Sequence, residues 1–454
     1  MATATTINRL SALRRPAVIV FLICLAIRAV YAWIHYDPQN PYHVWQDGDQ
    51  YIGLAQSLNN SGELRLWGRL TSLRVPGYPF LVALSWKLSQ PHHFACLAAL
   101  QVLLSSLAGA CLFLATRKLF GPVAGAISVG IYAIDPLMLL RTHAVASEIP
   151  SAIMTIVSAW LFGRVQERYS IGRVVACALG FLGAFNVRVE VGAAMIFMAC
   201  ASILTARAFK RSIGQWTPAR LGLLLTLFAV GWLPWVWRNW KVHRAFVPTT
   251  TEGGFNFMTK LGAHDGKFAW GLEGLDFVHT ERDVHGIAKG LEVQRDRLFF
   301  QTKIKRMKEQ PAQALKIMIR NVVQLYYPVP FFYFNLYDPI FGFTLVFFIL
   351  GAAHALRLAW KGHWQGMPLV AGVVGFTLAY MMVAGHSRYR SSLQPLIIML
   401  AGLGLTKCYE RMSRERFLTF TGSVVGIQGL LFAFYREPLK GKIILGALNL
   451  FGWN

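Results

Sequence analysis

The chain has 454 residues, of which 55% are hydrophobic and only 15% are charged, and its mean hydropathy is +0.44. A soluble protein carries about 25% charged residues and cannot bury this much apolar surface in one core. The formal charge of +24 is spread between long apolar runs rather than gathered in a patch, which argues against nucleic acid as a partner. The six cysteines avoid the long polar loops, so no disulfide framework is indicated. The composition excludes a soluble enzyme and leaves a polytopic membrane protein.

Apolar runs long enough to cross a bilayer recur along the chain. A spanning helix needs about 20 apolar residues. By this measure we expect about eleven spans, at residues 16–33, 94–116, 121–140, 147–163, 172–187, 190–207, 219–237, 338–358, 367–385, 391–406 and 417–434. The first run lacks a small-residue cleavage site, so it is predicted to be an uncleaved span. The sequence therefore predicts an all-α polytopic fold, with residues 1–454 forming a single integral membrane domain.

The distribution of basic residues predicts which side of the membrane each loop faces, because Lys and Arg in short loops favour the cytoplasm. With the N-terminus inside, the inner segments hold Arg9, Arg14, Arg15, Arg117, Lys118, Arg164, Arg168, Arg173, Arg207, Lys210, Arg211, Arg220, Arg357, Lys361, Lys407, Arg411, Arg414 and Arg416. The acids among them are Glu167, Glu410 and Glu415. We therefore predict a cytoplasmic N-terminus.

Two long loops then share the outer face, at about residues 35–93 and 238–337. The first contains short amphipathic stretches around turn signals at residues 59–62 and 76–79. The second opens with a loop rich in Thr and Gly, from Thr249 to Gly254. It continues with a basic amphipathic stretch, Val293 to Tyr327, which is interrupted at Pro311 and is of the kind that lies on a bilayer surface.

The first outer loop carries two carboxylates two residues apart, in Asp47-Gly48-Asp49-Gln50-Tyr51. They precede an amphipathic stretch, so the pair lies at a junction between loop and helix. One of them could act as a general base toward a hydroxyl, or the two together could hold a cation. The simpler interpretation is a helix N-cap, a position that Asp favours.

Further ionisable residues lie near the outer ends of spans, where charge is costly unless it is paired or functional. Glu148 lies at the start of the fourth span, and its simpler role is that of an acid in the first turn of a helix. Arg188 and Glu190 flank a tight turn and could pair with each other. Asp135, beside Pro136, could simply terminate the third span.

Several arginines lie on the predicted outer side, against the general trend. His386-Ser387-Arg388-Tyr389-Arg390 follows the ninth span and could meet an anionic partner, because Arg binds phosphate through two parallel hydrogen bonds. Contact with lipid headgroups is the simpler explanation. Arg28, Arg74 and Arg238 are further outward-facing cations. Acids and arginines from distant segments thus map to one membrane face, as an enzyme acting on a lipid phosphate requires.

The order of these motifs resembles a known family. The acidic motif ending in Tyr51 is followed by Arg74-Val75-Pro76-Gly77-Tyr78-Pro79, Ser147-Glu148, Pro234-Trp235-Val236-Trp237-Arg238-Asn239 and Ser387-Arg388-Tyr389-Arg390. The series resembles the bacterial GT-C glycosyltransferases of the dolichyl-phosphate-mannose protein mannosyltransferase and aminoarabinose transferase type (glycosyltransferase family 39). The resemblance extends from the first span to about residue 406, and the order of the motifs carries it rather than any single one.

The resemblance implies a GT-C-like fold in the bacterial inner membrane with its active site on the periplasmic face. It implies a polyprenyl-phosphate-linked sugar donor, a lipid, glycan or protein acceptor, and inversion at the anomeric carbon. Asp47 matches the catalytic acid, although Gly48 stands where the family often has Glu, so Asp49 could serve instead. Glu148 matches the second acid. Whether Glu148 shares a divalent metal (Mg²⁺ or Mn²⁺) with Asp47 or Asp49 is open.

The resemblance also implies roles for the remaining candidates. Arg388 matches the position that meets the donor phosphate, with Arg390, Arg238 and Arg74 as further phosphate-binding candidates. The other substrate-site candidates are Tyr51, Tyr78, Arg188, Glu190, His386 and Tyr389. Two alternatives stay open. One is a glycan polymerase or ligase that uses an oligosaccharide on a lipid diphosphate. The other is a lipid or sugar transporter, although transporters place their polar residues near the midplane.

Overall fold

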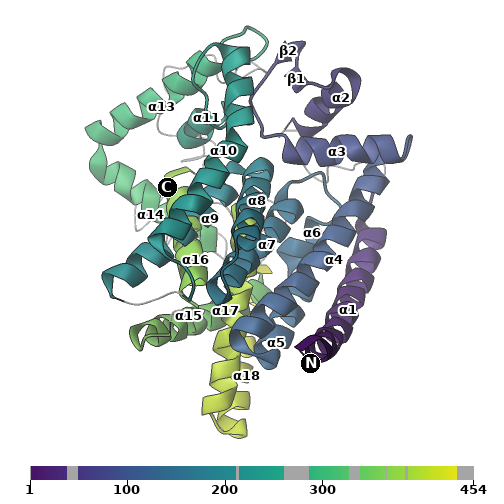
Figure 1. Ribbon diagram of the computed structural model, residues 1–454, viewed down its shortest axis with the longest axis vertical. Helices are drawn as coiled ribbons and strands as arrows, with labels where there is room; N and C mark the ends of the chain where they lie inside the picture. Colours follow the sequence, from purple (N-terminus) through teal and green to yellow (C-terminus); the bar gives the residue numbers. More distant parts are fainter. Residues whose placement is uncertain are drawn as a thin grey trace.

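The computed structural model describes residues 2–37, 50–210, 214–259, 286–326, 338–363, 366–383 and 387–436. Its elements are α1 (Ala2–His35), α2 (Tyr51–Ser61), β1 (Arg65–Leu66), β2 (Arg69–Leu70), α3 (Gly77–Leu88), α4 (His93–Phe120), α5 (Pro122–Ile134), α6 (Pro136–Leu140), α7 (Glu148–Glu167), α8 (Ile171–Val187), α9 (Val189–Ala208), α10 (Pro218–His243), α11 (Gly253–Thr259), α13 (Glu292–Glu309), α14 (Pro311–Tyr326), α15 (Pro339–Trp360), α16 (Met367–Val383), η1 (Ser387–Tyr389), α17 (Arg390–Arg411) and α18 (Arg414–Arg436). The fold is a helical bundle with a layer of shorter elements at one end (Figure 1).

Each predicted span coincides with a helix of this bundle, except the third, which is divided between α5 and α6. Within the described residues, α1, α4, α9, α10, α15, α17 and α18 are long and apolar enough to cross a membrane, and α5, α8 and α16 are shorter apolar helices. The fourth predicted span coincides with α7, whose buried face carries Ser151, Thr155 and Ser158 and is therefore less apolar. The structure confirms the prediction of an all-α polytopic fold and refines the bounds of its helices.

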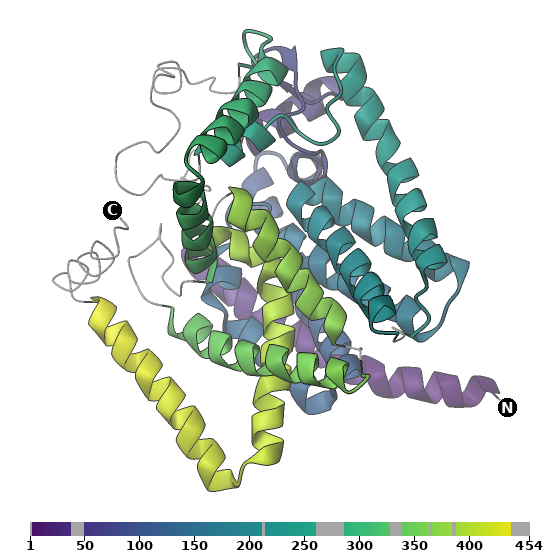
Figure 2. The same ribbon diagram turned by 90° about the vertical axis from the view of Figure 1, so that its left-hand side faces the viewer.

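Helix α17 forms the centre of the bundle. In its most apolar window 83% of the residues are buried, compared with 17% in α1 and 11% in α18, which lies at the edge of the bundle (Figure 2). Glycines let α15 pack closely on α17: a Cβ at Gly351 would clash with the Leu400 carbonyl, and one at Gly404 would clash with the Phe347 carbonyl. Small residues at helix contacts permit such close approach inside a membrane.

Two breaks in the helices follow from local sequence. Residues 121–140 were expected as one span, but the helix ends at Ile134, because Asp135 instead accepts a hydrogen bond from the Met138 N–H (2.9 Å) and caps α6. The helix therefore ends at Asp135, the alternative that the sequence left open, and does not continue to residue 140 as the predicted span implied. Pro311 likewise separates α13 from α14, as its lack of an N–H predicts.

The end layer is built from segments of both predicted outer loops. The antiparallel pair β1–β2, which the sequence did not reveal, follows α2, and α3 begins at Gly77. A Cβ at Gly77 would lie 2.5 Å from the Asn186 carbonyl oxygen, so glycine lets α3 start against the end of α8. Figure 1 shows α2, α3, α11 and α13 together at this end of the bundle.

A buried acid joins the two loops. Glu292 of α13 accepts hydrogen bonds from the hydroxyls of Thr71 (2.9 Å) and Thr251 and from the Ser72 N–H (3.1 Å). The Thr251 N–H also donates to the Ser72 carbonyl (3.1 Å). Residues from the first and second loops are therefore fixed to one another above the bundle, and the end layer can enclose a site.

Candidate active site

A cavity of about 210 Å³ lies where the end layer meets the bundle. Its walls come from α2, the loop before α3, the α8–α9 turn, the segment before α11, α16 and η1. The polar residues that line it are Tyr51, Arg74, Arg188, Glu190, Thr249, Thr250, Glu252, Asn256, Tyr380, Arg388 and Tyr389. Segments separated by more than 300 positions in the chain thus contribute to one site.

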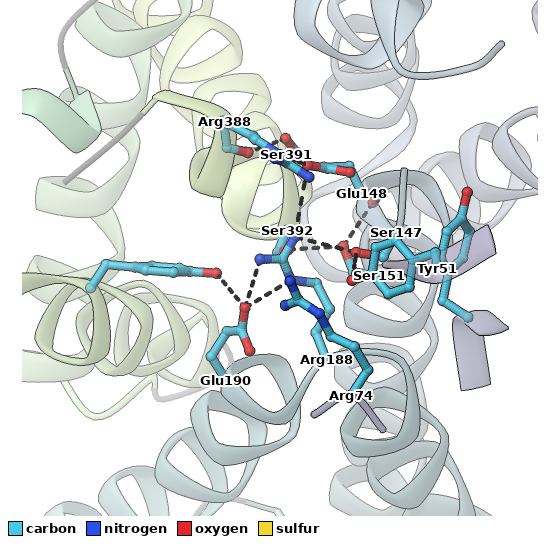
Figure 3. A network of polar contacts seen from close by, with 12 residues as sticks. Tyr51, Arg74, Ser147, Glu148, Ser151, Arg188, Glu190, Arg388, Ser391 and Ser392 are labelled. Atoms are coloured by element: carbon cyan, nitrogen blue, oxygen red, sulfur yellow. Dashed lines mark hydrogen bonds and ion pairs between the residues drawn. The ribbon is translucent and has the colours of Figure 1, made fainter. Parts of the chain in front are cut away.

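Glu148 and Arg388 are in direct contact beside this cavity (Figure 3). Glu148 is the first residue of α7 and is fully buried, and the Arg388 Nε donates to its Oε1. The Nη1 of Arg188 lies 3.8 Å from the same oxygen. Among the described residues, the other carboxylate oxygen, Oε2, has no hydrogen-bond partner. Oε1 of this one acid therefore contacts two arginines.

The turn between α8 and α9 supplies the opposite wall. Arg188 donates from Nε to Glu190 Oε1 (2.8 Å), and its Nη2 lies 2.7 Å from the same oxygen, which confirms that the two residues pair across the turn. The Tyr380 hydroxyl of α16 also donates to this oxygen (3.3 Å). Tyr389 stacks on Tyr380, with ring centroids 5.1 Å apart, and receives the Arg188 guanidinium 5.4 Å from its ring centroid. These contacts orient Arg188 toward the cavity.

The first outer loop contributes Tyr51 and Arg74. The Tyr51 hydroxyl donates to Ser147 Oγ (3.1 Å), which links the start of α2 to the residue before Glu148. The Arg74 guanidinium lies 5.3 Å from the centroid of the Tyr51 ring and forms an ion pair with Glu252. Tyr51 therefore connects the start of α2 with the cluster of Glu148, Arg188 and Arg388.

Three predicted residues lie near the cavity but do not line it. Tyr78 is buried, donates to Gln101 Oε1 (3.1 Å) and packs edge-on against Tyr51. Arg238 donates to Ser72 Oγ (2.7 Å) in the end layer. Arg390 is buried beside Asp338 (3.8 Å) and lies over the Phe341 ring, 3.3 Å from its centroid. The structure thus gives these three residues packing and anchoring contacts.

Asp47, Asp49 and His386 lie outside the described residues. Within the part of the chain that the structure describes, no group of three His, Cys, Asp or Glu side chains is placed to hold a metal ion. Glu148 faces the guanidinium groups of Arg388 and Arg188, and this positive surrounding is unfavourable for a divalent cation. Glu148 is the one residue of the three candidate ligands that the structure describes, so the divalent metal that the resemblance left open stays a prediction.

Five polar residues that line the cavity were not predicted as site residues: Thr249, Thr250, Glu252, Asn256 and Tyr380. Glu252 lies in the Thr- and Gly-rich segment that the sequence singled out only as a loop, and Tyr380 lies in an apolar span. Glu252 could have been found from the sequence, because it is an acid directly before the two glycines of that loop. Nothing local marked Tyr380, because its role depends on packing against Tyr389 and Glu190.

The carboxyls that anchor the cavity's outer wall have raised pKa values. Burial raises the pKa of Asp296 to about 6, although the Gly254 N–H donates to its Oδ1 (2.6 Å), and the charge of Glu252 raises the pKa further. Burial likewise raises the pKa of Glu292, against the effect of its hydrogen bonds from Thr251, Thr71 and Ser72. The wall therefore carries less negative charge near pH 6 than its composition suggests.

An apolar groove of about 610 Å³ adjoins the cavity. It is lined by Gly253, Phe257, Phe300, Ile304, Met307, Lys308, Met382 and Val383, and it shares Gly253 and Val383 with the polar cavity. The groove lies between α11, α13 and the end of α16. The polar cavity and the apolar groove thus meet at these two residues.

Comparisons with known proteins agree with this architecture. The sequence matches the family described as dolichyl-phosphate-mannose-protein mannosyltransferase over residues 74–235, a segment that includes Arg74, Glu148, Arg188 and Glu190. A comparison with curated protein sequences gave no match.

Solved structures of an oligosaccharyltransferase share the fold. The oligosaccharyltransferase of Archaeoglobus fulgidus in its apo form superposes with a TM-score of 0.56 at 14% identity, covering 92% of this chain and 54% of that one. The same enzyme, AglB, in complex with an inhibitory peptide and a dolichol-phosphate gives a TM-score of 0.54 at 14% identity, with 92% and 54% covered. ArnT from Cupriavidus metallidurans bound to undecaprenyl phosphate gives 0.39 at 16% identity, with 90% and 81% covered.

The chain spans about half the length of the oligosaccharyltransferase that it matches. The expected resemblance to GT-C glycosyltransferases is confirmed by the family match and the superposition. The chain is a multi-pass membrane protein that shares the fold of the Archaeoglobus fulgidus oligosaccharyltransferase.

Proposed function

We propose that this protein is a glycosyltransferase that moves a sugar from a polyprenyl-phosphate donor to an acceptor at the outer face of the bacterial inner membrane. The observation that carries the proposal is the convergence of Arg74, Arg188 and Arg388 on one cavity that adjoins an apolar groove. A lipid-linked sugar phosphate has both an anionic headgroup and a long apolar chain, and therefore needs both environments.

The size of the polar cavity is compatible with a single sugar. Ligand pockets usually enclose about 300–1,000 Å³, and the cavity formed by the described residues has about 210 Å³. This volume accommodates the headgroup of a monosaccharide phosphate. The donor panel described below distinguishes this donor from an oligosaccharide on a lipid diphosphate.

The groove supports a lipid-linked donor. Its lining is apolar apart from Lys308, and it meets the polar cavity at Gly253 and Val383. A prenyl chain lying between α11, α13 and α16 would bring its phosphate to this junction, within the region that the cavity arginines surround. Burial of apolar chain surface would contribute about 25 cal/mol per Å² to donor binding.

The chemistry proposed is a single displacement. Asp47 or Asp49 removes a proton from the acceptor hydroxyl or amine, and the freed lone pair attacks the anomeric carbon. The bond from that carbon to the phosphate oxygen breaks with its electron pair, so polyprenyl phosphate leaves and the anomeric configuration inverts. Arg388 stabilises the developing negative charge, as preorganised donors do in other transfer reactions. Tyr51 follows the two acids in sequence and lines the cavity, which supports the proposal that one of them acts on the acceptor there.

The arrangement in the membrane follows from the same proposal. The N-terminus is cytoplasmic, and the end layer with its cavity faces the periplasm. Residues 1–454 act as one membrane domain in which the loop at about 35–93 holds the catalytic acid and the loop at 238–337 covers the substrate. The acceptor is a lipid, a glycan or a protein, and the surrounding bilayer lipids are the other partners.

The test is transfer by the purified protein from a panel of sugars linked to undecaprenyl phosphate or undecaprenyl diphosphate. Released lipid phosphate is the readout. We expect activity with a monophosphate-linked donor, and loss of activity in either Asp47→Ala or Asp49→Ala. Glu63→Gln is the matched control, because its ion pair with Arg65 lies in the end layer away from the cavity. Full activity in both Asp variants would refute the assigned base, and activity only with diphosphate donors would favour the polymerase or ligase.

A further inference from the structure

Every arginine that lines the cavity is paired with a glutamate. Arg188 pairs with Glu190, Arg388 with Glu148, and Arg74 with Glu252. A donor phosphate that enters this cavity therefore has to compete with a carboxylate for any guanidinium that it binds. The three pairs differ in how firmly the structure holds them.

The first two pairs belong to the bundle and are supported by several neighbours. Arg188 makes two contacts with Glu190, faces Glu148 and lies against the Tyr389 ring. The carboxylate partner of Arg388 is fully buried at the start of α7. Removing either acid would leave a partly buried arginine without its nearest counter-charge, which is unfavourable. These carboxylates are fixed parts of the site.

The third pair lies between two loops. Arg74 belongs to the segment before α3, and Glu252 directly precedes α11. Within the described part of the chain, Arg74 is the ion-pair partner of Glu252, and both residues line the cavity. The Arg74–Glu252 pair thus joins the two loops of the end layer, apart from the bundle segments that supply the other two pairs.

The backbone on either side of Glu252 is fixed. The Thr251 N–H donates to the Ser72 carbonyl (3.1 Å), and the Thr251 hydroxyl donates to Glu292. On the other side, the Gly254 N–H donates to Asp296 (2.6 Å), and a Cβ at Gly254 would clash with the Asp296 carbonyl. The loop therefore cannot swing away as a lid, and a change at this site is confined to the Glu252 side chain.

We infer that the Glu252 carboxylate occupies the place on Arg74 that the lipid phosphate takes, and that it promotes release of the polyprenyl phosphate product. This inference rests on the proposed function. The donor is a phosphodiester with one negative charge, whereas the leaving lipid phosphate is a monoester that carries about −1.5 to −2 near pH 7. Glu252 returns to Arg74 as this product departs. The negative charge of Glu252 repels the product dianion more strongly than it repels the donor monoanion.

The test measures binding of undecaprenyl phosphate to the purified protein in detergent at pH 7.5, by calorimetry. Glu252→Gln removes the competing charge and keeps the size of the side chain. We expect it to bind this probe at least about tenfold more tightly than wild type, since losing one ionic competitor is worth about one factor of ten. Steady-state turnover should fall through stronger product inhibition.

Two further variants separate this role from a structural one. Glu252→Asp keeps the charge and should bind the probe as wild type does. Adding Glu252→Gln to Arg74→Gln should give no gain over Arg74→Gln alone, because the competition acts through Arg74. Glu63→Gln serves as the control ion pair of the end layer.

The outcomes that contradict the inference are distinct. Equal or weaker binding of undecaprenyl phosphate by Glu252→Gln, with wild type binding it, overturns the role of Glu252 and leaves the glycosyltransferase proposal intact. Failure of wild type to bind undecaprenyl phosphate overturns both. If Glu252→Gln does not fold, Glu252→Ala replaces it, since it also removes the competing charge. Tighter binding of undecaprenyl phosphate by this variant supports the inference, and equal or weaker binding overturns it.

Discussion

The Arg388 Nε donates a hydrogen bond to Oε1 of Glu148, although the two residues are 240 positions apart in the chain. Glu148 starts α7 and Arg388 lies in the short helix η1 that precedes α17. The contact is held by the packing of α7 on α17, where Ser151 and Ser392 hydroxyls lie 2.8 Å apart. The orientation of a proposed phosphate-binding arginine thus depends directly on the core of the membrane bundle.

Removing the charge of Glu148 should therefore affect stability and activity together. In Glu148→Gln, Arg388 loses its buried counter-charge while Arg188 keeps Glu190, and we expect a cost of about 3–5 kcal/mol. The double variant Glu148→Gln/Arg388→Gln restores the balance of charge at this contact and should regain part of the thermal stability without regaining transfer activity. Melting in detergent and release of lipid phosphate measure the two effects. Equal melting temperatures of the single and double variants would contradict the pairing.

Tyr380→Phe tests the wall that orients Arg188. The change removes the hydroxyl that donates to Glu190 at 3.3 Å, and keeps the ring that stacks on Tyr389. The loss of a hydrogen bond to a charged group is worth about 1.5–3 kcal/mol. We expect a rise in the donor KM of about tenfold with a small change in melting temperature. Tyr409→Phe, which alters an exposed tyrosine of α17, is the control and should behave as wild type.

Gly404→Leu tests the close packing of α15 on α17. Because a Cβ at this position already clashes with the Phe347 carbonyl, a larger side chain must push the helices apart. Overpacking of this kind costs about 1–3 kcal/mol or more. The variant should melt at a lower temperature than wild type. Gly426→Leu on α18, where a Cβ meets no atom within 4 Å, should leave the melting temperature nearly unchanged.

Asp296 should make stability depend on pH in the acidic range. Its pKa is raised from 3.8 to about 6 by burial, so the folded protein binds this proton more tightly than the unfolded chain. The stabilisation is present below about pH 4 and is lost as the pH rises through 6. In Asp296→Asn the side-chain oxygen can still accept from the Gly254 N–H, and no proton is released. The difference in melting temperature between this variant and wild type should therefore increase from pH 4 to pH 7 by about 2–4 °C.

Chelation tests whether the chemistry needs a divalent cation. The positive surroundings of Glu148 make this carboxylate a poor ligand for a metal, so we expect turnover of the purified protein to fall less than about twofold in EDTA. Dialysis against EDTA followed by addition of Mg²⁺, Mn²⁺ or Zn²⁺ is the measurement. Complete loss of turnover with full recovery on adding one of these metals would show that a metal site forms with residues other than those described.

The sequence by itself determined the fold class, the positions of the helices and their local features. Hydropathy reports burial or lipid contact residue by residue, so the spans could be located without tertiary information. Pairings between residues close in sequence were also predictable: Arg188 with Glu190 across a turn, the ending of a helix at Asp135, and the break at Pro311.

Only the tertiary structure decided which of the candidate arginines share one cavity. Arg74, Arg188 and Arg388 line it, whereas Arg238 and Arg390 are held by Ser72 and Asp338 outside it. The sequence shows each of them as a cation near the outer end of a span, and these are locally alike. Their difference arises from helix packing and from contacts across 166 to 240 positions, such as Arg238 with Ser72 and Arg388 with Glu148, which no local pattern encodes.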